Sequence, residues 1–321
     1  GLRLWEDEVS SPSKNVPPRL YCIQAREAPI AMVLARGNRK WWQLFRWWID
    51  QDRLEPGAWF HGNICRRACD VSPDGRLLFY AGSNRGPQLD WPRHPWSDDS
   101  VSFSAVSRLP FLTALAARPV DSFDKAEHWP FGGGVFAPPA DAEEETPETI
   151  WTPRIGTIPE SERVQWSVRP ARMKNRGSEL ESGWRDFDAF PSQALEYRLE
   201  TGEHISNRWF YGPAWKPRSV GSERLMMLWG GHNEHFYPDR EFVRLLYLLD
   251  HNEELPVRVP DAVWADWSHR GDLLVATIRG TIERRVVSSD GVETVWSHDL
   301  NGRTPDPQPA PEWAKSWTEP G

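Results

Sequence analysis

Two short segments of this chain, far apart in the sequence, share one pattern. Residues 70–82 read DVSPDGRLLFYAG, and residues 265–280 read ADWSHRGDLLVATIRG. In each segment, a polar turn that ends in Gly75 or Gly271 precedes an apolar run of β-forming residues. Pro presets its own φ and Gly supplies a positive φ, so the pattern predicts a tight turn between two strands. The repetition indicates one supersecondary unit that the chain uses several times.

Further strand-like runs recur along the chain, and together they predict an all-β fold. The clearest of them span residues 20–25, 29–34, 40–49, 101–107, 195–201 and 242–249. A length of 321 residues suits a β-propeller, in which small sheets share a ring. We expect about five to seven four-stranded blades with long loops between the strands.

The expected organisation has three parts: an N-terminal arm at residues 1–18, the propeller at residues 19–300, and a Pro-rich C-terminal tail at residues 301–321. Four of the tail's prolines alternate with other residues from Pro305 to Pro311, which predicts an extended, semi-rigid chain. Because the ends of a propeller chain often meet in one blade, residues 19–25 are expected to pair with strands near residues 281–296.

The two repeats resemble those of the degenerate WD-repeat and TolB-type β-propeller families. The resemblance depends on residues 72–78, SPDGRLL, and residues 266–274, DWSHRGDLL. The Gly-His and Trp-Asp pairs of orthodox WD repeats are absent from these segments. The resemblance implies a propeller fold, and it leaves the function open because such propellers serve as scaffolds, lectins and enzymes.

Composition narrows the class of protein. Hydrophobic residues make up 39% and charged residues 26%, a soluble globular profile without the roughly 20-residue apolar run of a membrane span. The net charge of -8 argues against a nucleic-acid partner, since such proteins usually carry a basic stripe. Three cysteines and no apolar leader favour the cytoplasm, with a secreted protein carrying one disulfide as the alternative.

Tryptophan is unusually abundant, with 20 residues beside only 6 Tyr. One interpretation is packing between sheets, because each large ring buries roughly 150–250 Å². The other is a partner-binding face, where Trp is enriched. Trp91, Trp96 and Trp129 lie in long irregular stretches and are the candidates for such a face.

Residues 229–239 form the strongest candidate site, with a Gly-Gly pair followed by several polar groups. These groups could hydrogen-bond a ligand, transfer protons or bind a metal, and the alternative is a loop that caps neighbouring backbone groups. A zincin is excluded because the His-Glu-x-x-His spacing is absent. The ligand- or partner-binding candidates here are His232, Asn233, Glu234, His235 and Asp239, of which His232 and His235 are weak metal candidates.

Two other clusters carry weaker signals. His61, Cys65 and Cys69 lie close together, but their spacing departs from that of zinc sites, and buried structural cysteines are the simpler interpretation. The glycines at 132–134 lack the Lys-Ser/Thr ending of a phosphate loop and predict close backbone packing. No Gly-x-Ser-x-Gly elbow is present. We therefore expect no cofactor and lean against an enzyme.

The sequence supports three hypotheses of different classes. The first is a cytoplasmic, non-catalytic propeller that acts as a scaffold or sensor module. It would bind a protein partner through the Trp-rich face of Trp91, Trp96, Trp129 and the 230–239 loop. The second is a propeller that binds a glycan or small ligand, because Trp rings stack on sugars. A variant of this second hypothesis is that the propeller is also a hydrolase. The third is a propeller stabilised by a metal at His232, Glu234, His235 and Asp239.

Overall fold

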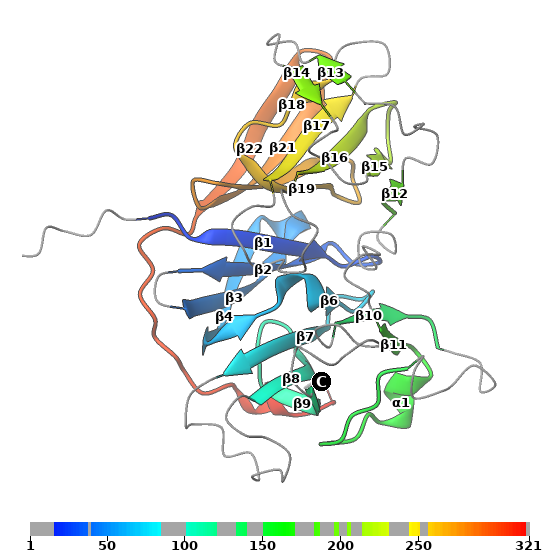
Figure 1. The fold of residues 1–321 in the computed structure, drawn as a ribbon, viewed down its shortest axis with the longest axis vertical. Helices are drawn as coiled ribbons and strands as arrows, with labels where there is room; N and C mark the ends of the chain where they lie inside the picture. The colour runs from blue at the N-terminus through cyan, green and yellow to red at the C-terminus, as the bar shows by residue number, and fades with distance from the viewer. Residues whose placement is uncertain are drawn as a thin grey trace, which may run out of the picture.

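The computed structural model of the chain describes eleven stretches of residues and is all-β (Figure 1). The stretches are 16–37, 40–84, 101–120, 133–139, 150–170, 183–186, 196–198, 204–206, 214–230, 244–250 and 256–318. Within them, the strands form six antiparallel sheets, designated A to F here in chain order. No helix in these stretches has the length and apolarity needed to cross a bilayer.

Sheets A and B occupy the first part of the chain, and both run in sequence order from one edge to the other. A single-turn 3₁₀ helix, η2 (Ile49–Gln51), joins the last two strands of sheet A. Sheet A consists of β1 (Arg19–Gln24), β2 (Ile30–Arg36), β3 (Trp41–Trp48) and β4 (Arg53–His61). Sheet B consists of β5 (Asn63–Ile64), β6 (Asp70–Val71), β7 (Leu77–Asn84), β8 (Val101–Arg108) and β9 (Ala114–Val120), with η3 (Arg66–Ala68) between β5 and β6.

The remaining sheets follow in chain order, with the short helix α1 (Glu160–Arg163) before the second strand of sheet C. Sheet C consists of β10 (Gly134–Ala137) and β11 (Ser167–Pro170), and sheet E of β13 (Glu196–Arg198) and β14 (His204–Ser206). Sheet D consists of β12 (Arg185–Asp186), β15 (Ala214–Pro217), β16 (Arg224–Gly230), β17 (Arg244–Asp250) and β18 (Val257–Arg258). Sheet F consists of β19 (Ala262–Trp267), β20 (Leu273–Thr277), β21 (Thr281–Ser288) and β22 (Gly291–Asp299), and η7 (Glu312–Lys315) follows it.

The inner strands are apolar on both faces because each central sheet packs against two neighbours. On β2, Met32 and Leu34 pack against sheet B, whereas Ala31 and Val33 pack against sheet F. Side chains of a strand alternate between its faces, so a run such as IAMVLA fills two interfaces at once. The opposite face of sheet B packs against sheet C, and sheet F packs against sheet D.

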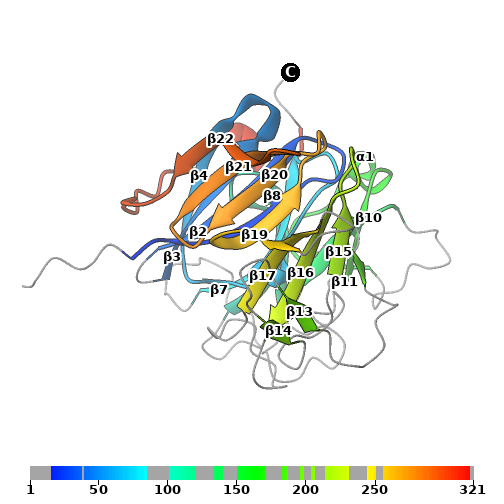
Figure 2. The same ribbon diagram turned by 90° about the horizontal axis from the view of Figure 1, so that it is seen from above.

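Four face-to-face interfaces therefore connect the sheets in the spatial order D–F–A–B–C, which Figures 1 and 2 show from two directions. Aromatic rings fill them: Trp47 stacks on Trp296 at 5.3 Å between sheets A and F, and Phe79 meets Trp151 edge-on at 5.4 Å. These contacts agree with the packing interpretation of part of the tryptophan content.

The expected pairing of residues 19–25 with strands near 281–296 is wrong. Strand β1 pairs with β2, and β21 pairs with β20 and β22. Residues 262–299 supply all four strands of sheet F, so the first strand of the chain has no place in that sheet. Sheet A packs on sheet F through side chains instead, with Leu20 and Cys22 of β1 in the shared core.

Candidate functional site

Four turns lie at one end of the sheets, here named the turn end. They join β1 to β2 of sheet A, β6 to β7 of sheet B, β15 to β16 of sheet D and β19 to β20 of sheet F. Direct contacts place them together. The Glu27 backbone N–H donates to the Pro73 carbonyl at 2.8 Å between sheets A and B. The Arg218 guanidinium of sheet D donates to the Gly271 carbonyl of sheet F at 2.7 Å.

Two buried carboxylates at the turn end occupy equivalent positions in the two sequence repeats. Asp70 and Asp266 each precede the serine that opens the turn, and they are 2% and 4% exposed. Asp70 accepts the Phe136 backbone N–H of sheet C at 2.8 Å, and Asp266 accepts from Lys216 Nζ of sheet D at 2.6 Å. Each carboxylate therefore joins its own sheet to a neighbouring one.

Sheet A is joined to both of its neighbours at the same end. Arg26, in the β1–β2 turn, ion-pairs with Asp70 at 3.5 Å and donates to the Phe136 carbonyl. On the other side, His269 of sheet F contacts Gln24 Nε2 through Nδ1 and the Arg26 carbonyl through Nε2, both at 3.0 Å. Polar contacts thus run continuously from sheet D to sheet C across all four interfaces.

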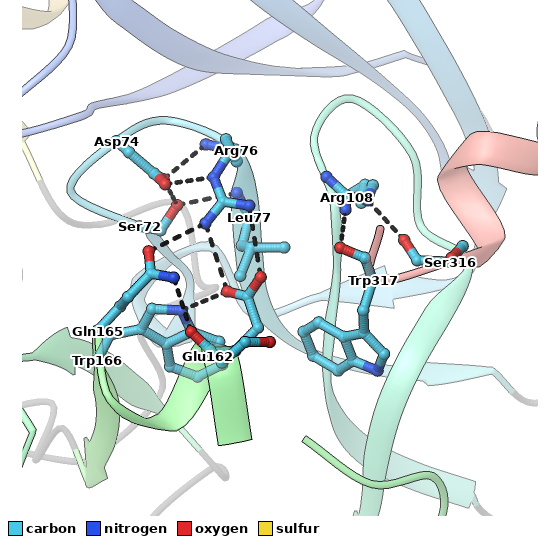
Figure 3. Close-up of polar contacts among 11 residues, drawn as sticks. Ser72, Asp74, Arg76, Leu77, Arg108, Glu162, Gln165, Trp166, Ser316 and Trp317 are labelled. Atoms are coloured by element: carbon cyan, nitrogen blue, oxygen red, sulfur yellow. Dashed lines mark hydrogen bonds and ion pairs between the residues drawn. The ribbon is translucent and has the colours of Figure 1, made fainter. Parts of the chain in front are cut away.

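The turn of residues 72–77 carries a second cluster, shown in Figure 3. Asp74 accepts from the Ser72 hydroxyl at 2.6 Å and from both the backbone and the guanidinium of Arg76. Arg76 also lies over Glu162 of α1, with two N···O distances of 3.4 Å. The Glu162 carboxylate in turn accepts from Trp166 Nε1 at 2.9 Å.

Burial and charge act in opposite directions on this cluster. Burial raises the pKa of Asp74, but the hydrogen bonds from Ser72 and Arg76 and the Arg76 charge outweigh it, so the pKa lies below its usual value. For Arg76, burial lowers the pKa, while the hydrogen bond and charge of Asp74 and the charge of Glu162 raise it to a net increase. Both groups are therefore held in their charged forms, which suits cross-linking of sheets B and C.

The chain that follows sheet F, residues 301–318, forms a strap along the molecule. In Figure 1 it runs from the end of β22 beside sheet A to sheet B. The Arg303 guanidinium lies 4.9 Å from the Phe45 ring centroid of sheet A, and Trp313 meets Phe111 edge-on at 5.3 Å. Residues 303–311 of the strap form neither helix nor strand, and the single turn η7 follows them.

Arg108 anchors the end of the strap, as Figure 3 shows. This side chain is only 2% exposed, yet its guanidinium donates to the Ser316 carbonyl at 2.6 Å and to the Trp317 carbonyl. The Trp317 ring lies 6.3 Å from that of Trp166, against the core between sheets B and C. The buried Arg108 guanidinium therefore holds the end of the strap through its main-chain carbonyls.

The far end of the sheets, opposite the turn end, receives the connections that the sequence singles out. The registers place the residue pairs Asn84–Val101, Ser102–Val120, Gly230–Arg244 and Gly134–Pro170 there. The intervening sequence segments 85–100, 121–132 and 231–243 therefore all begin and end at this end of sheets B, C and D.

The part of sheet A that reaches the far end carries aromatic side chains. Trp41 pairs with His61 across β3 and β4, and their ring centroids are 4.9 Å apart. The Trp59 ring lies edge-on to Trp41 at 6.3 Å. Trp41 and Trp59 are partly exposed and His61 is exposed, so the far end presents rings to solvent.

All the predicted site residues fall in those connections and lie outside the described residues. They are Trp91, Trp96, Trp129, His232, Asn233, Glu234, His235 and Asp239. Among the residues that are described, no group of three or more His, Cys, Asp or Glu side chains is arranged to hold a metal ion.

The cysteines of the weaker cluster are structural. Cys65 and Cys69 are buried free thiols that flank η3, and Cys69 Sγ donates to the Cys65 carbonyl at 3.3 Å. They lie beside a 3₁₀ turn rather than on one strand, because the Cys65 carbonyl also accepts the Ala68 N–H. Cys22 is buried in the core between sheets A and F, and burial raises the pKa of its thiol.

The chain matches no protein-family model and no curated protein sequence. Sequence reasoning missed Arg26, Arg108 and Lys216, whose partners lie in other sheets. The repeated turns were the sequence signal for this end, and the Asp two positions before the serine in both repeats, Asp70 and Asp266, could have marked its buried carboxylates.

Proposed function

We propose that the chain is a five-bladed propeller whose far end binds a protein partner, and that it acts as a non-catalytic scaffold or sensor module. The order of the sheets supports the ring. Sheets A, B, C, D and F follow one another in sequence, and sheet F, the last, packs back on sheet A, the first. A cyclic order of this kind is what a propeller requires.

One observation carries the assignment of the binding face. The three connections that hold Trp91, Trp96, Trp129 and the 232–239 residues all attach at the far end, where Trp41, Trp59 and His61 are also found. Trp is enriched in interface hot spots, because a large amphipathic ring buries much area at little conformational cost. A Trp-rich end on a rigid sheet array suits a protein partner.

The turn end offers a contrasting use of polar residues. Asp70 and Asp266 each accept a hydrogen bond from a neighbouring sheet, and Glu162 of α1 accepts from Arg76 in the β6–β7 turn of sheet B. These carboxylates fix the relative positions of the sheets, and a rigid frame keeps a binding face in one arrangement. The proposal therefore assigns stability to the turn end and recognition to the far end.

The test compares affinity purifications of three tagged full-length chains from the native source. The wild-type chain should retain a stoichiometric partner, and the variant W91A/W96A/W129A should retain at least about tenfold less, as expected for loss of hot-spot residues. The matched control V220A/R270A changes two exposed turn-end residues and should bind as wild type does. Loss of the partner by the control, or its retention by the triple variant, would contradict the proposal, as would a wild-type chain without a partner.

A further inference from the structure

The strap divides into an exposed spacer and a seated anchor. Residues 302–309 are all exposed, and they include Pro305, Pro307 and Pro309. Residues 310–317 follow, with Ala314 fully buried and Trp313 and Trp317 partly buried. The anchor is thus connected to sheet F through eight residues that are exposed throughout.

The anchor sits in a slot formed by Arg46, Arg108, Phe111 and Trp166, here named the strap slot. Arg108 contributes two guanidinium N–H groups to adjacent main-chain carbonyls. Phe111 and the Arg46 guanidinium contact the Trp313 ring, with Arg46 5.9 Å from its centroid, and Trp166 receives the Trp317 ring. The slot combines sequence-independent capture of a peptide backbone with two aromatic contacts.

We propose that the strap slot is a peptide-binding site that the chain occupies with its own residues 310–318. Its ligand on a partner protein is a segment with one 3₁₀ turn, like that of η7, which carries two aromatic residues four positions apart and a small residue directly after the first. This specification follows from Trp313, Ala314 and Trp317. The strap slot is separate from the far end. If this peptide-binding proposal fails, the proposed function of the far end is unaffected.

The contacts of the slot explain why a segment in trans can replace the one in cis. The Arg108 donors recognise carbonyl groups, which every peptide of this conformation offers. A tethered strap has an effective concentration on the order of millimolar, so it blocks weaker ligands until it is released. A partner segment must therefore bind more tightly than the strap or act when the strap is displaced.

The experiment converts the tether into a cleavable one in the full-length chain. A protease recognition sequence replaces residues 304–309, all of which are exposed. Binding of a fluorescent peptide of residues 309–318 is measured by anisotropy before cleavage and after cleavage with gel filtration. A matched peptide carries Trp313→Ala and Trp317→Ala, and circular dichroism follows the fold throughout.

Cleavage should raise the apparent affinity for the labelled peptide about 100-fold, because the competing strap is no longer tethered. The doubly substituted peptide should bind at least tenfold more weakly than the unsubstituted one. Three results would overturn the proposal: no gain in peptide binding after cleavage, equal binding of the two peptides, or unfolding of the chain when the strap leaves. In the last case the strap is part of the core rather than a bound ligand.

Discussion

The turns of the two sequence repeats have the same backbone conformation, but their side chains make different contacts. In both, the N–H of Gly75 or Gly271 donates to the carbonyl of Ser72 or Ser268, and both glycines have positive φ, at 76° and 81°. Both serine hydroxyls also accept a hydrogen bond from a backbone N–H just after the glycine, that of Leu77 in the first turn and that of Asp272 in the second. The repeated Ser and Gly therefore build the turn itself.

The two residues between Ser and Gly differ, and their side chains contact different parts of the molecule. In the first turn, Asp74 closes on Ser72 and Arg76. In the second, His269 contacts Gln24 and Arg26 of sheet A, and Arg270 pairs with Asp50 of sheet A at 2.9 Å. The Asp74 side chain therefore stabilises its own hairpin, whereas the His269 and Arg270 side chains join sheets F and A. The first turn reaches its neighbours instead through the Pro73 carbonyl and through Arg76. One motif thus serves two structural purposes because its variable positions are free to change.

The largest effect expected from this comparison concerns the glycines. A Cβ at position 75 would lie 2.9 Å from Ile30 Cβ of sheet A, whereas at position 271 the nearest atom is Arg218 Nε at 3.1 Å, on a long side chain. Both alanine variants carry the strain of a positive φ, about 1–2 kcal/mol. Gly75→Ala should lose about 1 kcal/mol more than Gly271→Ala because it also overpacks the interface.

Denaturant unfolding of the two glycine variants, side by side, measures the difference. Equal losses of unfolding free energy would mean that Ile30 moves aside without cost. The two turns would then tolerate a Cβ equally well, contrary to this prediction.

A smaller effect is expected at Asp74, and it depends on pH. The pKa of Asp74 is lowered in the fold, so its carboxylate stabilises the fold above the unfolded-state pKa of about 3.9 and loses this contribution as pH falls. Its side chain is 40% exposed, so solvent screens the interaction and Asp74→Asn should cost about 1 kcal/mol or less at pH 7.

Thermal unfolding of the wild type and Asp74→Asn between pH 7 and pH 3 measures this effect. The two melting temperatures should begin to converge as pH falls below about 4, and they should meet only once pH has passed through the lower pKa of the folded state, where the wild-type carboxylate becomes protonated. A difference that stays constant down to pH 3 would show that the geometry of the turn, rather than the charge of Asp74, is what matters.

The smallest effect concerns Arg270, whose side chain is 68% exposed while that of its partner Asp50 is 33% exposed. Exposed ion pairs contribute about 0–1 kcal/mol and are screened by salt. Arg270→Ala should therefore cost about 0.5 kcal/mol at low ionic strength and almost nothing at high salt. Urea unfolding at two salt concentrations checks this, and a large loss that ignores salt would assign Arg270 a packing role between sheets A and F.

The two repeats also show which parts of the fold can be predicted from local sequence. The Ser-Pro-Asp-Gly and Ser-His-Arg-Gly turns were predicted because Pro, Gly and short polar side chains select a backbone conformation within a few residues. The apolar runs predicted strands such as β2 and β20, because strands that face two cores are apolar at nearly every position. The all-β class follows from these local signals.

The partners of individual strands required the tertiary structure. No local feature of β1 indicates that it packs on β19 and β20 rather than pairing with β21, because pairing between strands far apart in the sequence is decided by how the sheets fill space. The same is true of Arg108, an ordinary residue in the sequence RLPF, which becomes a buried anchor only when the strap arrives from 208 residues away. Sequence by itself determined the turns, the strands and the extended strap, since each depends on neighbours in the chain. Tertiary structure alone decided which sheets meet, which carboxylates bridge them and where the strap ends, since these depend on the burial of groups that are distant in sequence.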